Sequence, residues 1–147
     1  MKKAIAISIA TAALVAATTP VYASVITVKE QNQSEEEKFV FEDALIRIQP
    51  GDTVVFEPAD RGHNAESITG MLPAGAVAIK TPFSKEGRVT FTTPGVYGVK
   101  CLPHFGLGMI AIIVVGDPVN LAEVKQAAEK LPPKAKARAA KLLAQLS

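Results

Sequence analysis

Residues 96–115 constrain this chain more than any other segment. Two strand-like runs, 96–100 and 109–115, are joined by the loop Cys101-Leu-Pro-His104-Phe-Gly-Leu-Gly-Met109. The run after the loop is the most apolar of the chain and predicts a strand buried on both faces. Strands fix both ends of the loop, and a proline and two glycines shape it. We therefore expect a thiolate, an imidazole and a thioether to converge on one point.

A second histidine, His63, lies in the loop after the predicted strand 53–57. Two histidines, one cysteine and a weak axial methionine form the ligand set of a blue-copper site, which suits both Cu(I) and Cu(II). Zinc also accepts Cys and His, but structural zinc uses four strong ligands and a thioether is a poor one. Taken singly, each residue is more often a turn or core residue. Together they predict a site for one copper ion made by His63, Cys101, His104 and Met109.

Short segments rich in β-branched and aromatic residues alternate with turn signals such as Pro50-Gly51-Asp52 and Pro94-Gly95. This pattern predicts a mainly β chain folded as a sandwich. The expected strands before the copper loop are residues 25–28, 39–41, 45–48, 53–56 and 88–92.

The tail changes character after residue 116, and two helices are expected, 121–130 and 134–146. Asn120 is a good N-cap residue, with Glu123 at the position of a capping box. The second helix has an apolar face that could pack on the sandwich or lie on a membrane. We favour packing, because the face is mostly alanine. Residues 24–116 are thus expected to form the sandwich, and 117–147 a helical extension of the same domain.

Residues 1–23 have the layout of a secretory signal peptide: Lys2 and Lys3, an uncharged apolar run, then Val21-Tyr22-Ala23 before a cleavage site. The apolar run is too short for a membrane anchor, so no stable membrane insertion is expected. Without Lys2 and Lys3, 14 basic residues face 14 acidic ones. This balance argues against nucleic-acid binding. A lone cysteine in an exported protein cannot form an internal disulfide, which favours a metal ligand.

The sequence resembles the type I copper proteins, or cupredoxins, and most closely the pseudoazurin family. The resemblance rests on 50–54, Gly62-His63-Asn64, 94–101, Pro103-His104 and Gly108-Met109. The loop spacing is shared with plastocyanins, but plastocyanins lack the two C-terminal helices. The resemblance implies a Greek-key β-sandwich and a monomeric periplasmic one-electron carrier, not an enzyme. It further implies that a copper nitrite reductase is the usual partner.

The resemblance also implies roles for single residues. His63, Cys101 and His104 would be equatorial ligands and Met109 the axial one, with Asn64 steadying the ligand loops. His104 would present its ring edge to solvent, inside an apolar docking patch of the loop residues Pro103, Phe105, Gly106 and Leu107, with Met71 and Pro73 as further members. Basic residues near the patch would steer it to an acidic partner: Arg61, Lys80 and Lys100.

Three features depart from the family pattern. The acidic run Glu35-Glu36-Glu37 occupies a hairpin that is typically more basic, and Leu102 replaces a common threonine. Phe39 stands where methionine is frequent. We expect its ring to pack on the His104 imidazole and to alter the pH dependence of the reduction potential.

Two other function classes remain open at this point. A copper storage or delivery protein would bind the metal exchangeably, but the exposed Met and His clusters typical of carriers are lacking. An enzyme could use Cys101 and His104 as nucleophile and base. No acidic residue lies nearby in the sequence to orient that histidine.

Overall fold

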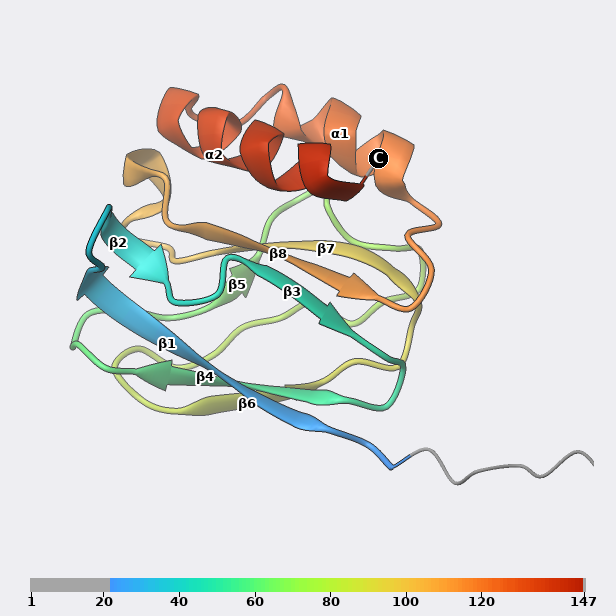
Figure 1. Ribbon diagram of the computed structural model, residues 1–147, viewed down its shortest axis with the longest axis horizontal. Helices are drawn as coiled ribbons and strands as arrows, with labels where there is room; N and C mark the ends of the chain where they lie inside the picture. The colour runs from blue at the N-terminus through green and yellow to red at the C-terminus, as the bar shows by residue number, and fades with distance from the viewer. Residues whose placement is uncertain (1–21, 147) are drawn as a thin grey trace, which may run out of the picture.

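The computed structural model describes residues 22–146, which form two four-stranded sheets and a C-terminal helical layer (Figure 1). The first sheet has the order β2 (Lys38–Phe41), β1 (Val25–Gln33), β4 (Thr53–Pro58), β6 (Gly87–Thr90). The second has the order β3 (Leu45–Ile48), β8 (Ile110–Val115), β7 (Gly95–Lys100), β5 (Glu66–Ser67). Strands β1 and β4 run parallel, as do β3 and β8, and the other neighbours are antiparallel. The predicted β-sandwich with two C-terminal helices is confirmed.

Strand β8 is buried along its whole length, as its unbroken apolar sequence predicts. Alternate side chains of a strand point to opposite faces. Ala111, Ile113 and Val115 face the core between the sheets. The residues between them enter a second core beneath the helices: Ile110, Ile112 and Val114. The strand that follows the loop of residues 101–109, called the copper loop below, thus belongs to both cores.

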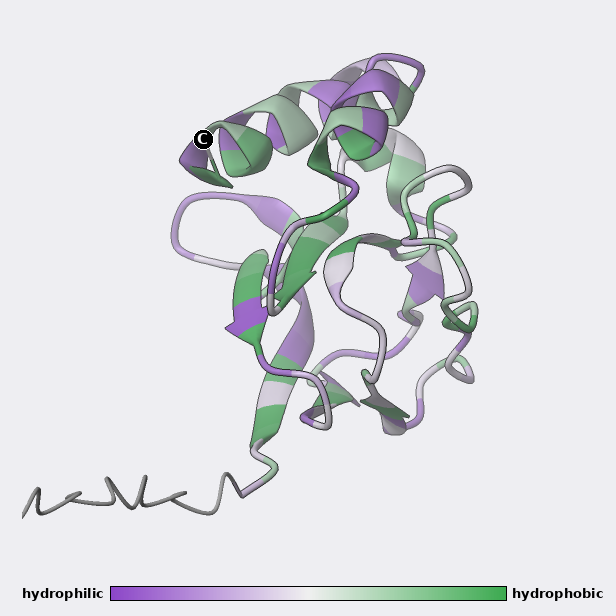
Figure 2. Ribbon diagram, turned by 90° about the vertical axis from the view of Figure 1, so that its right-hand side faces the viewer, coloured by the Kyte–Doolittle hydropathy of each residue, from purple (hydrophilic) through white to green (hydrophobic). Residues whose placement is uncertain are grey.

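Helices α1 (Leu121–Ala128) and α2 (Pro133–Leu143) cover the outer face of the second sheet, followed by the short 3₁₀ turn η2 (Ala144–Leu146). Both helices alternate polar and apolar residues (Figure 2). The predicted apolar face of α2 is buried against the sheet, through Ala135, Ala139, Leu142 and Leu143. Packing on the sandwich is therefore the correct alternative. Among the described residues, none of the helices combines the length and apolarity needed to cross a bilayer.

The predicted capping box at the start of α1 is wrong. Asn120 makes no side-chain capping bond. Its amide instead accepts a hydrogen bond from the Val96 backbone N–H, 2.7 Å away, and donates to the Val96 carbonyl at 3.0 Å. The Asn120 side chain therefore bonds to β7 and not to the first turn of its own helix, and it fastens the start of α1 to β7.

Other differences from the prediction are smaller. Strand β5 was not expected, β1 is longer than predicted, and the predicted strand 88–92 ends at Thr90. The helices end earlier than predicted, at Ala128 and Leu143. The predicted signal peptide falls, except for its last two residues, outside the described part of the chain.

Candidate metal centre

Two loops at one end of the sandwich carry the predicted ligands. His63 lies in the loop after β4, and Cys101 follows β7 directly. The turn η1 (Phe105–Leu107) then carries the chain from His104 to Gly108, which has φ of 91°. This left-handed conformation favours glycine and closes the turn through a bond from the Gly108 N–H to the Phe105 carbonyl. The local sequence therefore fixes the shape of the loop.

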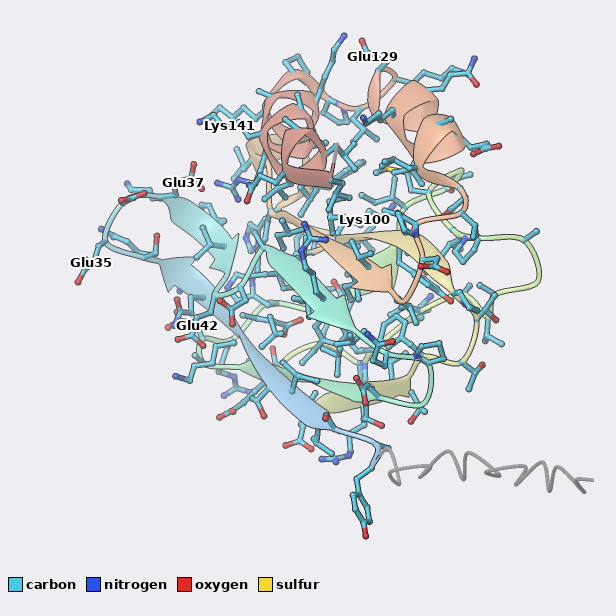
Figure 3. All side chains as sticks on the ribbon, turned by 45° about the vertical axis from the view of Figure 1, so that its right-hand side comes forward. Glu35, Glu37, Glu42, Lys100, Glu129 and Lys141 are labelled. Carbon is cyan, nitrogen blue, oxygen red and sulfur yellow. The ribbon has the colours of Figure 1, made fainter. Side chains whose placement is uncertain are left out.

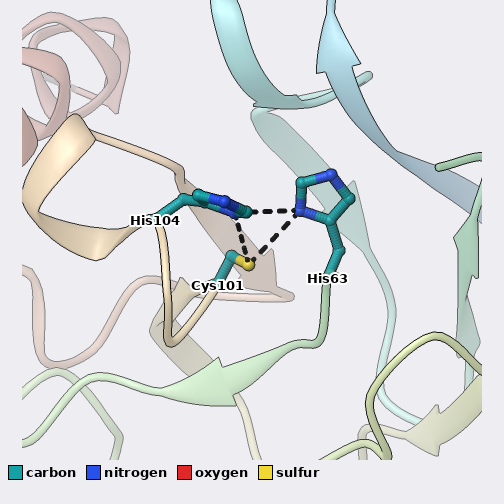
Figure 4. A group of neighbouring side chains, drawn as sticks. All are labelled: His63, Cys101 and His104. Carbon is teal, nitrogen blue, oxygen red and sulfur yellow. Dashed lines mark hydrogen bonds between the residues drawn. The ribbon is translucent and has the colours of Figure 1, made fainter. Parts of the chain in front are cut away.

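Three donor atoms from these loops converge (Figure 4). The Cys101 Sγ lies 3.5 Å from Nδ1 of His63 and 3.5 Å from Nδ1 of His104. The two Nδ1 atoms are 3.1 Å apart. The structure thus brings together three of the four predicted ligands, from positions up to 41 residues apart in the sequence.

The protonation of these groups follows from their burial. Desolvation lowers the pKa of both histidines, and the neighbouring His104 lowers the pKa of His63 further. Both imidazoles are therefore neutral near pH 7, which is the form that binds metals. Burial raises the pKa of the Cys101 thiol, against the opposite effect of the backbone N–H groups of Asn64 and His104. Without a metal, the cysteine is a protonated thiol.

Met109 closes the loop that begins at Cys101, and Asn64 joins that loop to the loop of His63. Met109 is fully buried, and its backbone accepts a hydrogen bond from Cys101 N–H and donates one to the His104 carbonyl. The Asn64 side chain accepts from Leu102 N–H at 2.9 Å and donates to Glu66 at 3.0 Å. The expected role of Asn64 in bridging the ligand loops is confirmed by these bonds.

The β1–β2 hairpin adds one contact to each histidine. Asn32 and Phe39 lie across from each other, between the pairs Gln31–Val40 and Gln33–Lys38. Asn32 Oδ1 lies 3.0 Å from His63 Nε2, so it accepts a hydrogen bond from Nε2–H, and the Nδ1 lone pair faces the site. The Phe39 ring stacks on His104, with centroids 4.1 Å apart and planes at 14°. The predicted packing of Phe39 on His104 is confirmed; its effect on pH dependence stays a prediction.

Backbone strain in the described residues gathers around this site. Phe39 and Ser84 are the non-glycine residues there with positive φ, 54° and 57°. The left-handed conformation costs roughly 1–2 kcal/mol for a residue with a side chain. Ser84 N–H donates to the His63 carbonyl, and the Ser84 hydroxyl accepts from Gly62 N–H. Each strained residue therefore positions one histidine, as expected where function requires the conformation.

The loop surface carries part of the predicted docking patch. Leu102 and Leu107 are 47% and 44% exposed, and Pro103 and Gly106 are exposed as well. The Lys100 amino group lies 5.0 Å above the Phe105 ring.

Two predicted members of the patch are wrong. Met71 is fully buried, and it packs so closely on Gly98 that a Cβ there would lie 2.8 Å from the Met71 Cβ. Pro73 is also buried, against Gly95. Both side chains pack against β7, where Gly98 and Gly95 leave room for them, and neither reaches the surface.

Comparison with known proteins bears directly on this geometry. Residues 28–116 match the model of the copper-binding proteins of the plastocyanin/azurin family. A pseudoazurin from Paracoccus pantotrophus is 43% identical over 139 residues, covering 94% of each chain. The chain belongs to the pseudoazurin family. A pseudoazurin from Methylorubrum extorquens is 47% identical over 112 residues, 76% of each chain. The crystal structure of pseudoazurin from Methylobacterium extorquens AM1 superposes with a TM-score of 0.80 at 41% identity, covering 84% of this chain and 99% of that one.

Membership of this family establishes the cofactor and the class of function. Pseudoazurins are copper proteins that transfer electrons and are not enzymes. The donor set fits that metal, because two neutral imidazoles and one thiol meet at a point where His63 and Cys101 are fully buried. The nucleophile-and-base alternative for Cys101 and His104 is therefore set aside.

The sequence did not reveal Asn32 or Ser84 as parts of the site. Each reaches a histidine from a strand end or turn that carries no motif, 31 residues from His63 in the case of Asn32. The left-handed backbone of Ser84 has no signal in a single sequence.

Proposed function

We propose that His63, Cys101, His104 and Met109 hold one copper ion and that the protein carries single electrons in the periplasm to a copper nitrite reductase. The observation that carries the ligand assignment is the convergence of Sγ and two Nδ1 atoms within 3.5 Å of one another. Copper bound there would supply a one-electron couple between Cu(I) and Cu(II).

The surrounding residues suit such a couple because they hold the donor atoms in place beforehand. Asn64 joins the two ligand loops, and Asn32 fixes the tautomer of His63. Donors fixed in this way move little when the charge changes, which keeps electron transfer fast. His104 is partly exposed, so its ring edge is the path for the electron to the surface.

A visible absorption spectrum of residues 24–147 with added Cu(II) tests the ligand assignment. A strong thiolate-to-copper band that is bleached by reductant and restored by oxidant is expected. Cys101→Ala should abolish the band. Met109→Leu should keep a thiolate-to-copper band, and the reduction potential of the copper should change. A band that survives Cys101→Ala would overturn the assignment.

The docking surface is proposed to be the exposed loop around His104, with Arg61, Lys80 and Lys100 steering an acidic partner. Arg61 and Lys80 are exposed and Lys100 is half-buried. Charge steering acts on association rates and weakens with salt. Changing all three to glutamate should slow the reduction of a copper nitrite reductase at low salt by about tenfold or more. Lys125→Glu, on α1, is the matched control and should leave the rate unchanged.

Location and domain limits are part of the same proposal. Residues 1–23 are proposed as an export signal removed before Ser24, with 24–116 as the sandwich and 117–147 as its helical extension. Amino-terminal sequencing of the protein from a periplasmic extract should begin at Ser24. Recovery in the cytoplasm with Met1 retained would contradict the proposal.

A further inference from the structure

We propose that Arg138 of α2 is a positioning residue for the copper centre, because it holds Phe39 in the backbone conformation that stacks the Phe39 ring on His104. The proposal rests on the assignment of His104 as a copper ligand. It makes the C-terminal helix a determinant of the redox site and not only a cover for the sheet.

Phe39 needs support from outside its own hairpin. Its φ of 54° is unusual for a bulky side chain, and such conformations persist only where the surroundings impose them. The hairpin loop is closed by Ser34, whose hydroxyl and backbone N–H both bond to the Glu37 carbonyl. These bonds end two residues before Phe39, and the pairing with β1 is made by its neighbours Lys38 and Val40.

Arg138 supplies the missing support from the other side of a groove. One guanidinium nitrogen donates to the Phe39 carbonyl at 3.3 Å, and the other pairs with the Glu37 carboxylate. The side chain is only 14% exposed, and it crosses a groove of about 550 Å³ between β2, the copper loop and α2. Figure 3 shows Glu37 on the side of the hairpin toward α2. A planar guanidinium is suited to hold two acceptors at fixed positions.

Helix α2 also contacts the copper loop, on the side of His104 away from the hairpin. Gly108 packs against the backbone of Lys134 so closely that a Cβ at residue 108 would lie 3.2 Å from the Lys134 carbonyl oxygen. The far face of α2 is anchored in the core through residues such as Ala135 and Ala139. Helix α2 therefore sets the position of the hairpin and of the copper loop relative to each other, with the His104 ring between them.

Stacking restricts the rotation and displacement of the His104 imidazole. Arg138→Ala releases Glu37 and the Phe39 carbonyl and lets Phe39 return to an ordinary conformation. The expected result is a loss of the ring contact and a shift of the reduction potential in the same direction as that caused by Phe39→Ala.

The test is a double-mutant cycle with Arg138→Ala, Phe39→Ala and both together, measured by voltammetry of the copper-loaded protein. Arg138→Ala should shift the potential in the wild-type background and add nothing in the Phe39→Ala background. Lys141→Ala is the matched control, because Lys141 lines the same groove and its side chain makes no ion pair among the described residues. It should leave the potential unchanged.

A second readout separates this proposal from the ligand assignment. The nuclear Overhauser contact between the Phe39 and His104 rings should be present in the metal-free wild type and weakened in Arg138→Ala. If Arg138→Ala does not fold, Arg138→Lys serves, since one ammonium keeps the charge but cannot span both acceptors as the guanidinium does. An unchanged ring contact, or equal shifts in both backgrounds, would overturn the proposal. A missing thiolate band in the wild type would instead overturn the ligand assignment.

Discussion

Two buried carboxyl groups of the first sheet lie at opposite ends of β4 and have opposite surroundings. Asp52, in the turn before β4, accepts hydrogen bonds of 2.7 Å from the backbone N–H groups of Gln49 and Ser24. Glu30, on β1 beside the last residue of β4, is fully buried, and neither carboxyl oxygen has a hydrogen-bond partner among the described residues.

The pKa values follow this difference. Backbone N–H groups of Gln49 and Ser24 lower the pKa of Asp52, whereas burial raises the pKa of Glu30 to about 7. Glu30 is at the same end of the sandwich as His63, and its charge raises the pKa of Cys101. At the end of the domain far from the copper loops, backbone hydrogen bonds stabilise the buried charge of Asp52. At the end near the copper loops, the Glu30 carboxyl is buried without such bonds from any described residue.

The largest effect should come from the metal, which would stabilise the fold through the end of the domain that carries the copper loops and not through the Asp52 end. Copper at about a thousand times its dissociation constant would add about 4 kcal/mol to the free energy of unfolding. Cys101→Ala should lose this copper-dependent rise in Tm, and Asp52→Asn should keep it. Calorimetry with and without copper measures both. Equal loss in the two variants would mean that the ends are not independent.

Glu30→Gln should change the pH dependence of stability. Below about pH 4.5 the carboxyl is protonated in the folded and unfolded states, and its burial has no ionisation penalty. As the pH rises through 4.5 to 7, the unfolded chain ionises first, so the wild type loses stability that the variant keeps. The gap should grow by on the order of 2–3 kcal/mol between pH 4 and pH 8. Urea unfolding of metal-free protein measures it, and a gap that does not vary with pH would contradict the prediction.

Asp52→Asn should have the opposite pH profile and a smaller effect. A lowered pKa means that the ionised carboxylate stabilises the fold above its unfolded pKa, and that this stability is lost as the pH falls through the folded value. The variant should be less stable than the wild type at pH 7, and the gap should close as the pH falls below 3.8 and through the folded-state pKa of Asp52. Thermal unfolding across this range is the measurement. Divergence at low pH would show that the loss arises from packing.

The smallest effect concerns the proposed export cleavage. A chain that begins at Ser24 has an ammonium group where the peptide N–H now donates to Asp52, and charge-assisted hydrogen bonds are about twice as strong as neutral ones. At pH 7 it should have a higher Tm than a chain that retains Ala23, and this advantage should fade at pH above the amine pKa of about 8. In the Asp52→Asn background the two chains should melt alike; a persistent difference would contradict the ion pair.

The predictable parts of this molecule are those that depend on local pattern. Alternation and turn signals located most strands, and the close spacing of Cys101, His104 and Met109 singled out the copper loop. Glu30 escaped notice because charge suggests exposure, although alternation from Val28 places it inside the sandwich.

The unpredicted parts depend on contacts between distant segments. Arg138 meets the hairpin across 99 to 101 residues of sequence, and no spacing rule relates them. Asn120 satisfied a local capping rule in the sequence, yet its amide binds β7. Contacts of this kind between distant segments join α2 to the hairpin that carries Phe39 and join the start of α1 to β7.

The double burial of β8 has a consequence for motion. Amide hydrogens in a strand covered on both faces exchange only through the rarest opening events, whereas surface loops open readily. The copper loop is a surface feature whose last residue leads directly into that strand, and whose first follows β7, its hydrogen-bonded neighbour. Fluctuations of the exposed leucines are therefore limited at Cys101 and Met109, the two ends of the loop, whereas His104 lies between them and has the stacked Phe39 ring to restrict it.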